Sequence, residues 1–174
     1  MRSAFLLAIA VTTVVIAPGH AVEPDVRDTL SGAITCTGNP LAQVRGLVDG
    51  GSNFTKGYAV TQFGEGIDHT AVVIVRTPIQ IAGATSDTVF ATGEPQHEGF
   101  AGLVYARFTG DAQRVVRELR LAAPAAGTDV AIGKYERRLT VAVDGEKNPR
   151  CPMTIALTPV SDREFLLGCG WCPG

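Results

Sequence analysis

The sequence predicts an α+β domain in which a mainly antiparallel sheet carries one or two short helices and is held by two disulfides. Three observations support this fold class. Runs rich in β-branched and aromatic residues fill most of the chain from residue 58 onward, two segments have the spacing and end signals of helices, and the four cysteines form an even set. An all-β sandwich is the alternative.

The first residues have the pattern of a secretory signal peptide. Arg2 precedes the apolar run 5–16, and small residues stand at Gly19 and Ala21, where signal peptidase requires them for cleavage after Ala21. An apolar run of this length is too short to cross a bilayer as a helix. We therefore expect residues 1–21 to be removed and the protein to be periplasmic or secreted.

Residues 22–174 are expected to form a single soluble domain. The chain carries 15 Lys and Arg against 17 Asp and Glu, so it has no net positive field with which to bind nucleic acid. After the signal peptide, no apolar stretch is long enough to span a membrane. Arginine outnumbers lysine and alanine is abundant, which favours a high-GC bacterial source.

The first predicted helix begins at Pro40. Asn39 is a favourable N-cap, and proline is common at the first helical position. Gly50 and Gly51 end the helix. Between these signals, apolar residues recur at helical spacing: Leu41, Val44 and Val48.

The second predicted helix covers residues 112–121. Asp111 is its N-cap, and its apolar residues fall on one stripe. A β-strand over residues 115–121 is the competing interpretation.

Three arginines, Arg114, Arg117 and Arg120, recur on the polar side of this second helix. Such a row could bind an anion or an acidic partner. Arg114 and Arg117 are therefore candidate binding residues. The alternative is that they form the ordinary solvated face of an amphipathic helix, which can have the same composition.

Most of the remaining chain predicts short strands separated by turns. Residues 139–143 alternate in polarity as a half-buried strand does, and Asp144 and Gly145 then form a turn. The predicted strands are Tyr58 to Phe63, Thr70 to Arg76, Thr88 to Ala91, Leu103 to Phe108, Leu139 to Val143, Thr154 to Thr158 and Glu164 to Leu167.

The four cysteines, Cys36, Cys151, Cys169 and Cys172, are expected to form two disulfides in an oxidising compartment. A hairpin that turns at residues 161–163 would place Cys151 near Cys172, which leaves Cys36 to pair with Cys169. A small change of register would instead pair Cys36 with Cys172 and Cys151 with Cys169.

The spacing of Cys169 and Cys172 is also that of a redox-active C-x-x-C motif, so thiol–disulfide exchange is an alternative function. A redox-active cysteine needs a lowered thiol pKa, which usually comes from a helix N-terminus. Pro173 and Gly174 follow the motif directly and do not predict such a helix. Structural disulfides are therefore the preferred interpretation.

The best candidate binding element is the polar loop from Glu94 to Phe100. Its carboxylates and imidazole, at Glu94, His97 and Glu98, could contact a partner, bind a metal or transfer a proton. Functional residues are frequent on loops held by a rigid scaffold. The loop departs from the H-E-x-x-H pattern of zinc proteases, because Ala101 stands where the second histidine would be.

These features predict an exported, non-catalytic binding module, for example an inhibitor or accessory protein whose partner is a protein or a small ligand. The sequence has no G-x-S-x-G motif and no phosphate-binding Walker motif, and neither a cofactor nor a metal site is expected. A small hydrolase or metal-dependent enzyme is the alternative. It would use His69 and His97, whose imidazoles would then have to reach one cleft.

Export with cleavage after Ala21 predicts that the mature protein begins at Val22, because that is the first residue beyond the signal peptide. Intact mass and N-terminal sequencing of the protein recovered from the periplasm or the medium measure this directly. Recovery of the chain with its first 21 residues still attached would contradict the prediction.

Overall fold

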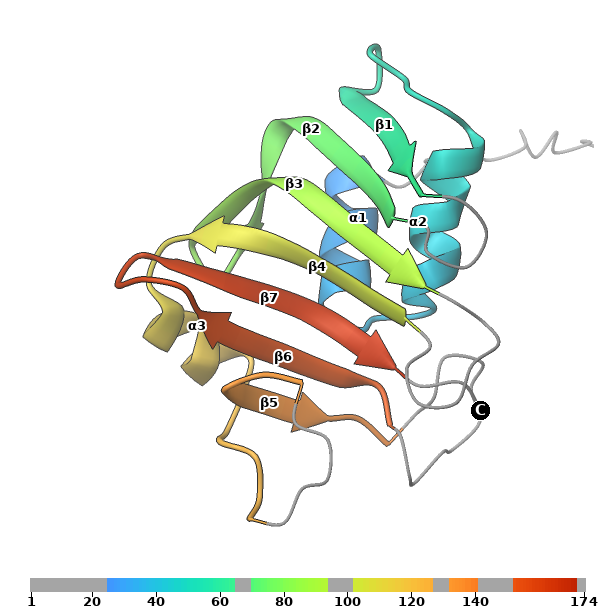
Figure 1. The fold of residues 1–174 in the computed structure, drawn as a ribbon. Coiled ribbons are helices and arrows are strands. Elements are labelled where there is room, and N and C mark those ends of the chain that lie inside the picture. The colour runs from blue at the N-terminus through green and yellow to red at the C-terminus, as the bar shows by residue number, and fades with distance from the viewer. Residues whose placement is uncertain (1–24, 65–69, 94–101, 127–131, 141–151, 172–174) are drawn as a thin grey trace, which may run out of the picture.

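The computed structural model describes residues 25–64, 70–93, 102–126, 132–140 and 152–171 (Figure 1). These residues form three helices and a seven-stranded antiparallel sheet, which confirms the α+β class. The helices are α1 (Val26–Ile34), α2 (Pro40–Asp49) and α3 (Ala112–Glu118). The strands are β1 (Tyr58–Phe63), β2 (Thr70–Ile81), β3 (Ala84–Gly93), β4 (Gly102–Thr109), β5 (Tyr135–Arg138), β6 (Thr154–Pro159) and β7 (Glu164–Trp171).

The strand order in the sheet is β1-β2-β3-β4-β7-β6-β5. Strands β1 to β4 form an antiparallel meander. The chain then passes through α3 to the far edge of the sheet, where β5 lies, and returns through β6 to β7 (Figure 1). β7 therefore lies inside the sheet, where its pairing with β4 joins the two halves.

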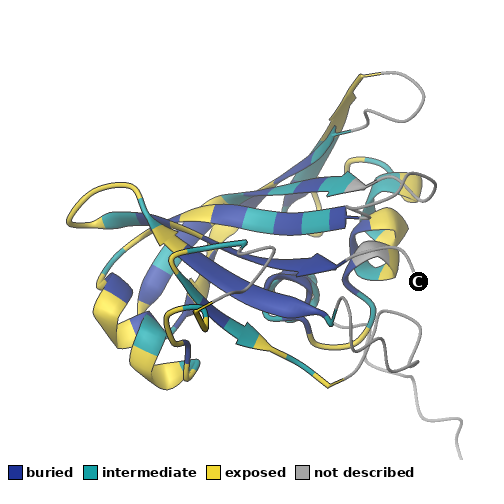
Figure 2. Ribbon diagram, turned by 60° about the horizontal axis from the view of Figure 1, so that its bottom comes forward, coloured by how far each residue is buried: buried dark blue, intermediate teal, exposed yellow. Residues whose placement is uncertain are grey.

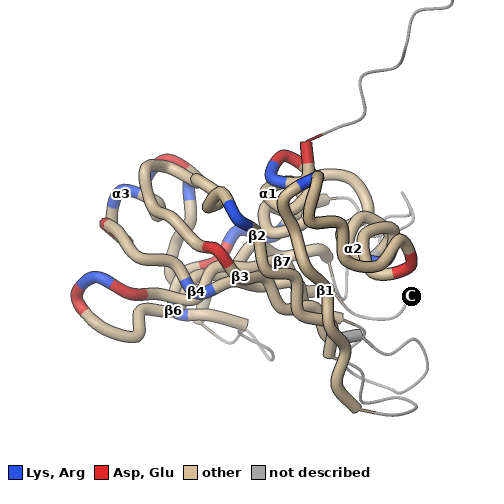
Figure 3. Tube along the Cα trace, turned by 90° about the horizontal axis from the view of Figure 1, so that it is seen from above, with Lys and Arg blue, Asp and Glu red and all other residues tan. Residues whose placement is uncertain are grey.

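All three helices lie on one side of the sheet, which we call the inner face (Figure 3). Side chains alternate across a strand, so β4 buries Val104, Ala106 and Phe108 on this face and leaves the side chains between them at least partly exposed (Figure 2). Leu30 of α1 and Val115 of α3 pack into the same core. The other side of the sheet, the outer face, is covered by none of the described helices.

The helix α2 has the predicted boundaries. The Asn39 side chain accepts a hydrogen bond from the Ala42 N–H at 2.9 Å, and Gly50 stands at the C-cap. Among the described residues, no helix is long and apolar enough to cross a membrane. The predicted signal peptide lies outside the described residues.

The helix α3 begins as predicted but ends earlier. The Asp111 side chain accepts hydrogen bonds from the first turn, which confirms it as the N-cap. The helix ends at Glu118 rather than at Leu121, because Arg120 takes a left-handed conformation with φ of 54°. The strand alternative for residues 115–121 is wrong.

The helix α1 is absent from the sequence-based prediction. Asp25 caps it by accepting a hydrogen bond from the Arg27 N–H at 2.9 Å. The Arg27 guanidinium also binds the Asp25 carboxylate and lowers its pKa to about 2. The helix is short, and isolated helices of such length are not stable without tertiary packing, which Leu30 and Ile34 provide here.

The hairpin of β2 and β3 is longer than predicted. β2 continues past Arg76 to Ile81 even though Pro78 predicts an end, because the pairing shifts between Ile74 and Ile79 and a proline is tolerated at such an irregularity. Ala82 and Gly83 then form the turn, both with positive φ. β3 consequently begins at Ala84 rather than at Thr88.

In the C-terminal half, one predicted strand is wrong in its described part and one predicted hairpin is confirmed. Leu139 and Thr140 follow β5 instead of beginning a strand, while residues 141–143 lie outside the described residues. The predicted β6–β7 hairpin is confirmed, with its turn at residues 161–163 and Thr154 paired with Gly170.

Short segments close much of both outer edges of the sheet. On β1, the Ser52 hydroxyl accepts a hydrogen bond from the Val60 N–H at 2.9 Å, and Tyr58 exchanges backbone hydrogen bonds with Asn53. On β5, Glu136 exchanges backbone hydrogen bonds with Ala122. An edge occupied in this way is a poor template for an added strand.

Candidate binding site

Each of the seven strands has one terminus at the same end of the sheet, which we call the loop end. Phe63 pairs with Thr70 across β1 and β2, and Gly93 pairs with Gly102 across β3 and β4. Trp171 at the end of β7 pairs with the same Gly102. Several connections between strands therefore begin and end here, and in many β domains the functional loops are gathered at one end of the sheet in this way.

The residues of the predicted loop, Glu94, His97, Glu98 and Phe100, lie outside the described residues. The strand ends that flank them are described, and both belong to the loop end. His97 follows Gly93 by four residues, a stretch that reaches at most about 14 Å. The predicted binding segment therefore begins and ends next to strand termini of the loop end.

His69 also lies outside the described residues, directly before Thr70 of β2. Thr70 pairs with Thr92 near the end of β3, so the segments that carry His69 and His97 adjoin neighbouring strands. The structure describes neither imidazole, and the required common cleft stays a prediction.

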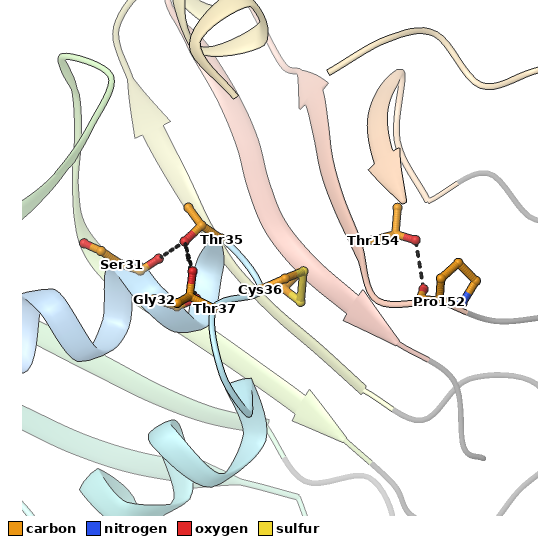
Figure 4. Close-up of a disulfide and its surroundings, with 8 residues drawn as sticks. Ser31, Gly32, Thr35, Cys36, Thr37, Pro152 and Thr154 are labelled. Atoms are coloured by element: carbon orange, nitrogen blue, oxygen red, sulfur yellow. Dashed lines mark hydrogen bonds between the residues drawn. A yellow bond between two sulfur atoms is a disulfide. The ribbon is translucent and has the colours of Figure 1, made fainter. Parts of the chain in front are cut away.

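A disulfide fixes α1 to the sheet close to the loop end (Figure 4). Cys36 is bonded to Cys169, with 5.2 Å between their Cα atoms, and both residues are buried. Cys36 directly follows the C-cap Thr35, whose hydroxyl donates to the Ser31 carbonyl at 2.7 Å. This bond confirms the preferred pairing of Cys36.

The same bond bears on the redox hypothesis. Because Cys169 is bonded to Cys36 and is buried, it does not form a disulfide with Cys172 in this structure. Thiol–disulfide exchange at the C-x-x-C motif would need that second bond. Cys151 and Cys172 lie outside the described residues.

The indole of Trp171 braces the loop end from the inner face. It is buried against Gly102, where a methyl group would come within 2.2 Å of the ring atom Cζ2. Gly102 is the first residue of β4 and directly follows the loop that carries Phe100. The contact between Gly102 and the Trp171 indole therefore lies at the C-terminal end of that loop.

The arginines of α3 lie elsewhere. α3 follows the far end of β4, so Arg114 and Arg117 are at the opposite end of the sheet from the predicted loop (Figure 1). The Arg114 Nε donates to the Glu118 carboxylate at 2.7 Å, which raises the pKa of Arg114 and satisfies its charge locally. The guanidinium also lies over Gly83. The two parts of the predicted binding set do not form one site.

A metal site is not visible in the described part of the chain, where no group of three or more His, Cys, Asp and Glu side chains converges. The buried Glu136 instead binds the backbone: its carboxylate accepts a hydrogen bond from the Ile132 N–H at 3.2 Å. Its other carboxylate oxygen accepts a hydrogen bond from Arg138 Nε at 3.4 Å.

The sequence-based prediction missed an aromatic pair on the outer face. The rings of Phe90 and Tyr105 stack with centroids 5.3 Å apart, on directly paired positions of β3 and β4. Both side chains are half-buried. The alternation of β4 indicates that Tyr105 points outward, but only the register between the strands reveals its partner.

Comparisons with protein-family models, with curated proteins and with solved structures found no match to this chain.

Replacing Gly102 with alanine should lower the free energy of unfolding by about 1–3 kcal/mol, because the new methyl group overlaps the buried Trp171 indole. Chemical denaturation measures this change.

Gly46→Ala is the matched control. Gly46 lies within α2 with no atom close to its missing side chain, so alanine there should raise the free energy of unfolding by up to about 1 kcal/mol. Equal stability of the two variants would show that Trp171 does not hold the loop end.

Proposed function

We propose that this chain is an exported, non-catalytic binding module that contacts a periplasmic or extracellular protein partner through the segment from Glu94 to Phe100. Export rests on the signal-peptide pattern of residues 1–21. An inhibitor or an accessory subunit is the most concrete form of this function.

The observation that supports the proposal is the construction of the loop end. The strand ends on either side of the segment, Gly93 and Gly102, are paired with each other, and Gly102 packs against the buried Trp171. The Cys36–Cys169 disulfide fixes the neighbouring strand to α1. A segment with such a base is attached at two rigid points, which limits the conformational entropy lost on binding.

The segment also has suitable chemistry for recognising a protein. Phe100 offers an apolar anchor, and His97 lies between the carboxylates of Glu94 and Glu98. Interfaces commonly combine a central aromatic side chain with a polar rim.

A hydrolase that uses His69 and His97 is the second candidate. It is favoured by one observation, the pairing of Thr70 with Thr92: His69 directly precedes the first of these residues and His97 follows the second by five residues in the sequence.

Alanine at Phe100 or His97 should weaken partner capture by about ten-fold or more, because each removes a contact at the centre of the proposed interface. Capture is measured as the amount of one identified partner that immobilised mature protein retains from the native periplasm or medium. The melting temperatures should stay unchanged.

Phe54→Ala is the matched control, since Phe54 is 69% exposed in the turn before β1, away from the loop end. His69→Ala separates the two candidates: it leaves capture intact in a binding module and abolishes turnover in the hydrolase. Full capture by both loop variants would refute the proposed binding segment.

We further infer that Cys151 and Cys172 form the second disulfide. Antiparallel pairing places Thr154 opposite Gly170. Cys151 precedes the first of these by three residues and Cys172 follows the second by two, so the chain can bring the two cysteines together.

Peptide mapping of the non-reduced mature protein should therefore give two cross-linked pairs, Cys36–Cys169 and Cys151–Cys172, because the paired residues Thr154 and Gly170 are only three and two residues from the second pair of cysteines. Thiol alkylation before digestion serves as the control for exchange during handling. Free thiols at Cys151 and Cys172 would contradict this inference without affecting the first pair.

A further inference from the structure

Cys36 stands at a position of α1 where helices usually carry glycine. It directly follows the C-cap Thr35 and has a left-handed backbone with φ of 56°. The Thr37 N–H donates to the Gly32 carbonyl at 2.8 Å, and the Cys36 N–H donates to the Ala33 carbonyl at 3.4 Å. These are the two hydrogen bonds of a Schellman motif, in which glycine is the favoured left-handed residue. A side chain makes this conformation unfavourable, so a contact elsewhere in the fold must hold Cys36 in it.

The disulfide to Cys169 is that contact (Figure 4). Cys36 is 4% exposed, and Cys169 is fully buried on the inner face of β7. The bonded residues are 133 positions apart in the sequence, so the bond closes a loop that includes most of the domain. A cross-link that closes a long loop removes more freedom from the unfolded chain than one that closes a short loop. The strained cysteine is therefore explained by the bond, which glycine could not form.

The bond acts at the base of the candidate binding segment. Cys169 pairs with Val104, and Trp171 pairs with Gly102 at the end of the same two strands. Because residues two apart in a strand share a face, the side chains of Cys169 and Trp171 are neighbours in the inner core. The Trp171 indole lies against Gly102, which follows the segment from Glu94 to Phe100. A shift of Cys169 therefore reaches the contact at the end of this segment.

Without the bond, α1 is held by burial alone. It has nine residues, and helices of this length need tertiary packing to be stable. Leu30 and Ile34 are fully buried and supply that packing. Two free thiols would leave no covalent restraint on Cys36, whose backbone would then relax and break the two hydrogen bonds of the helix end. The inner side of β7 at Cys169 would lose its attachment to α1 in the same step.

We propose that the Cys36–Cys169 bond is a redox switch for partner binding. With both residues as thiols, the loop end is loose and capture is weak, whereas oxidation makes the loop end rigid and able to capture the partner. The inference rests on the proposed function, because the regulated site is the segment from Glu94 to Phe100. The switch restricts binding to an oxidising compartment, which the signal-peptide pattern predicts for this chain.

Oxidation is balanced by a second disulfide, that of a donor protein or of a small molecule such as oxidised glutathione. The Cys36 thiolate attacks the donor, which breaks the donor's S–S bond and releases its first thiol. The Cys169 thiolate then attacks the Cys36 sulfur, forms the buried bond and releases the second donor thiol. The two cysteines lose two electrons and two protons, and the donor gains both.

Trp171 is the one tryptophan of the chain, so its fluorescence reports on the loop end directly. In mature Cys151→Ser/Cys172→Ser protein, the Cys36–Cys169 bond is the one that dithiothreitol changes. Its reduction should raise the bimolecular rate constant for acrylamide quenching by about three-fold or more, because the loosened indole meets the solvent. The far-UV circular dichroism should keep the signal of the folded sheet. Loss of that signal, or an unchanged quenching constant, would overturn the proposal.

Cys36→Gly and Cys36→Ala are matched variants, since neither can form the bond. Glycine adopts the left-handed conformation without strain, whereas alanine keeps the strain of cysteine. The quenching constant should therefore be about two-fold higher in Cys36→Ala than in Cys36→Gly, because the end of α1 relaxes in the first variant and persists in the second. Equal constants would overturn a switch that depends on the relaxation of Cys36.

Amide hydrogen exchange of the wild-type protein tests the switch without any substitution. Reduction should accelerate exchange at Gly102 and Trp171 by about ten-fold more than at Phe108 and Phe165, which pair at the opposite end of the same two strands. Equal acceleration at both ends would identify a general stabilising cross-link and overturn the proposal.

Capture of the identified partner completes the test. Cys36→Ala in the Cys151→Ser/Cys172→Ser background takes the place of the reduced form here, so that no reductant reaches the partner's own disulfides. It should capture about ten-fold less partner than the same protein with the Cys36–Cys169 bond, because the binding-competent state is less populated. Equal capture by the two proteins would overturn the switch. No capture by the bonded protein would instead refute the proposed function, whereas quenching and exchange would still decide whether the bond controls the loop end.

Discussion

The pairing of β7 with β4 is the interaction on which the rest of this structure depends. It runs from Gly102↔Trp171 to Thr109↔Glu164 and joins residues from the two halves of the chain. Without it, the N-terminal meander and the C-terminal strands would be two separate small sheets, neither large enough to bury an independent core. The Cys36–Cys169 disulfide lies on this strand pair and adds α1 to the same unit.

The central position of β7 also explains its composition. Phe165, Leu167, Cys169 and Trp171 all point to the inner face and are buried. On the other face, Gly168 lies where a Cβ would come within 2.5 Å of the Val104 carbonyl oxygen, and Gly170 receives Ile132. β7 therefore carries large side chains on its inner side and no side chain at Gly168 and Gly170 on its outer side, so that neighbouring segments can approach it closely at these two glycines.

The topology places candidate binding residues that are close in the sequence at distant positions on the sheet. The loop of Glu94 to Phe100 and the arginines of α3 are close along the chain, yet β4 lies between them and directs them to opposite ends of the sheet. Conversely, Cys36 and Cys169 are 133 residues apart and are bonded. The protein therefore has a loop end braced by Trp171, an outer face without a described helix, and a helical inner face that is packed.

Local signals predicted the local structure well. β1 was predicted at its observed bounds, and both capping residues, Asn39 and Asp111, are confirmed, because a cap is decided by a side chain and the backbone within three residues of it. Prediction was wrong where long-range packing decides. α1 is stabilised by the core rather than by its own propensity, and β2 continues through Pro78 because β3 pairs with it on both sides of the irregularity. The candidate binding loop was named from its composition, but its position at the braced end of the sheet follows only from the strand order.

The sequence by itself determined the fold class, the caps of α2 and α3 and the absence of a net charge suited to nucleic acid. These properties depend on residue type and on short spacings along the chain. Only the tertiary structure decided that β7 lies inside the sheet, that Cys36 is bonded to Cys169 rather than to Cys172, that Phe90 stacks on Tyr105 and that Arg114 is far from the loop end. The physical reason is that strand order and register are set by the combined burial of side chains distant in sequence, and no local pattern records which strands become neighbours.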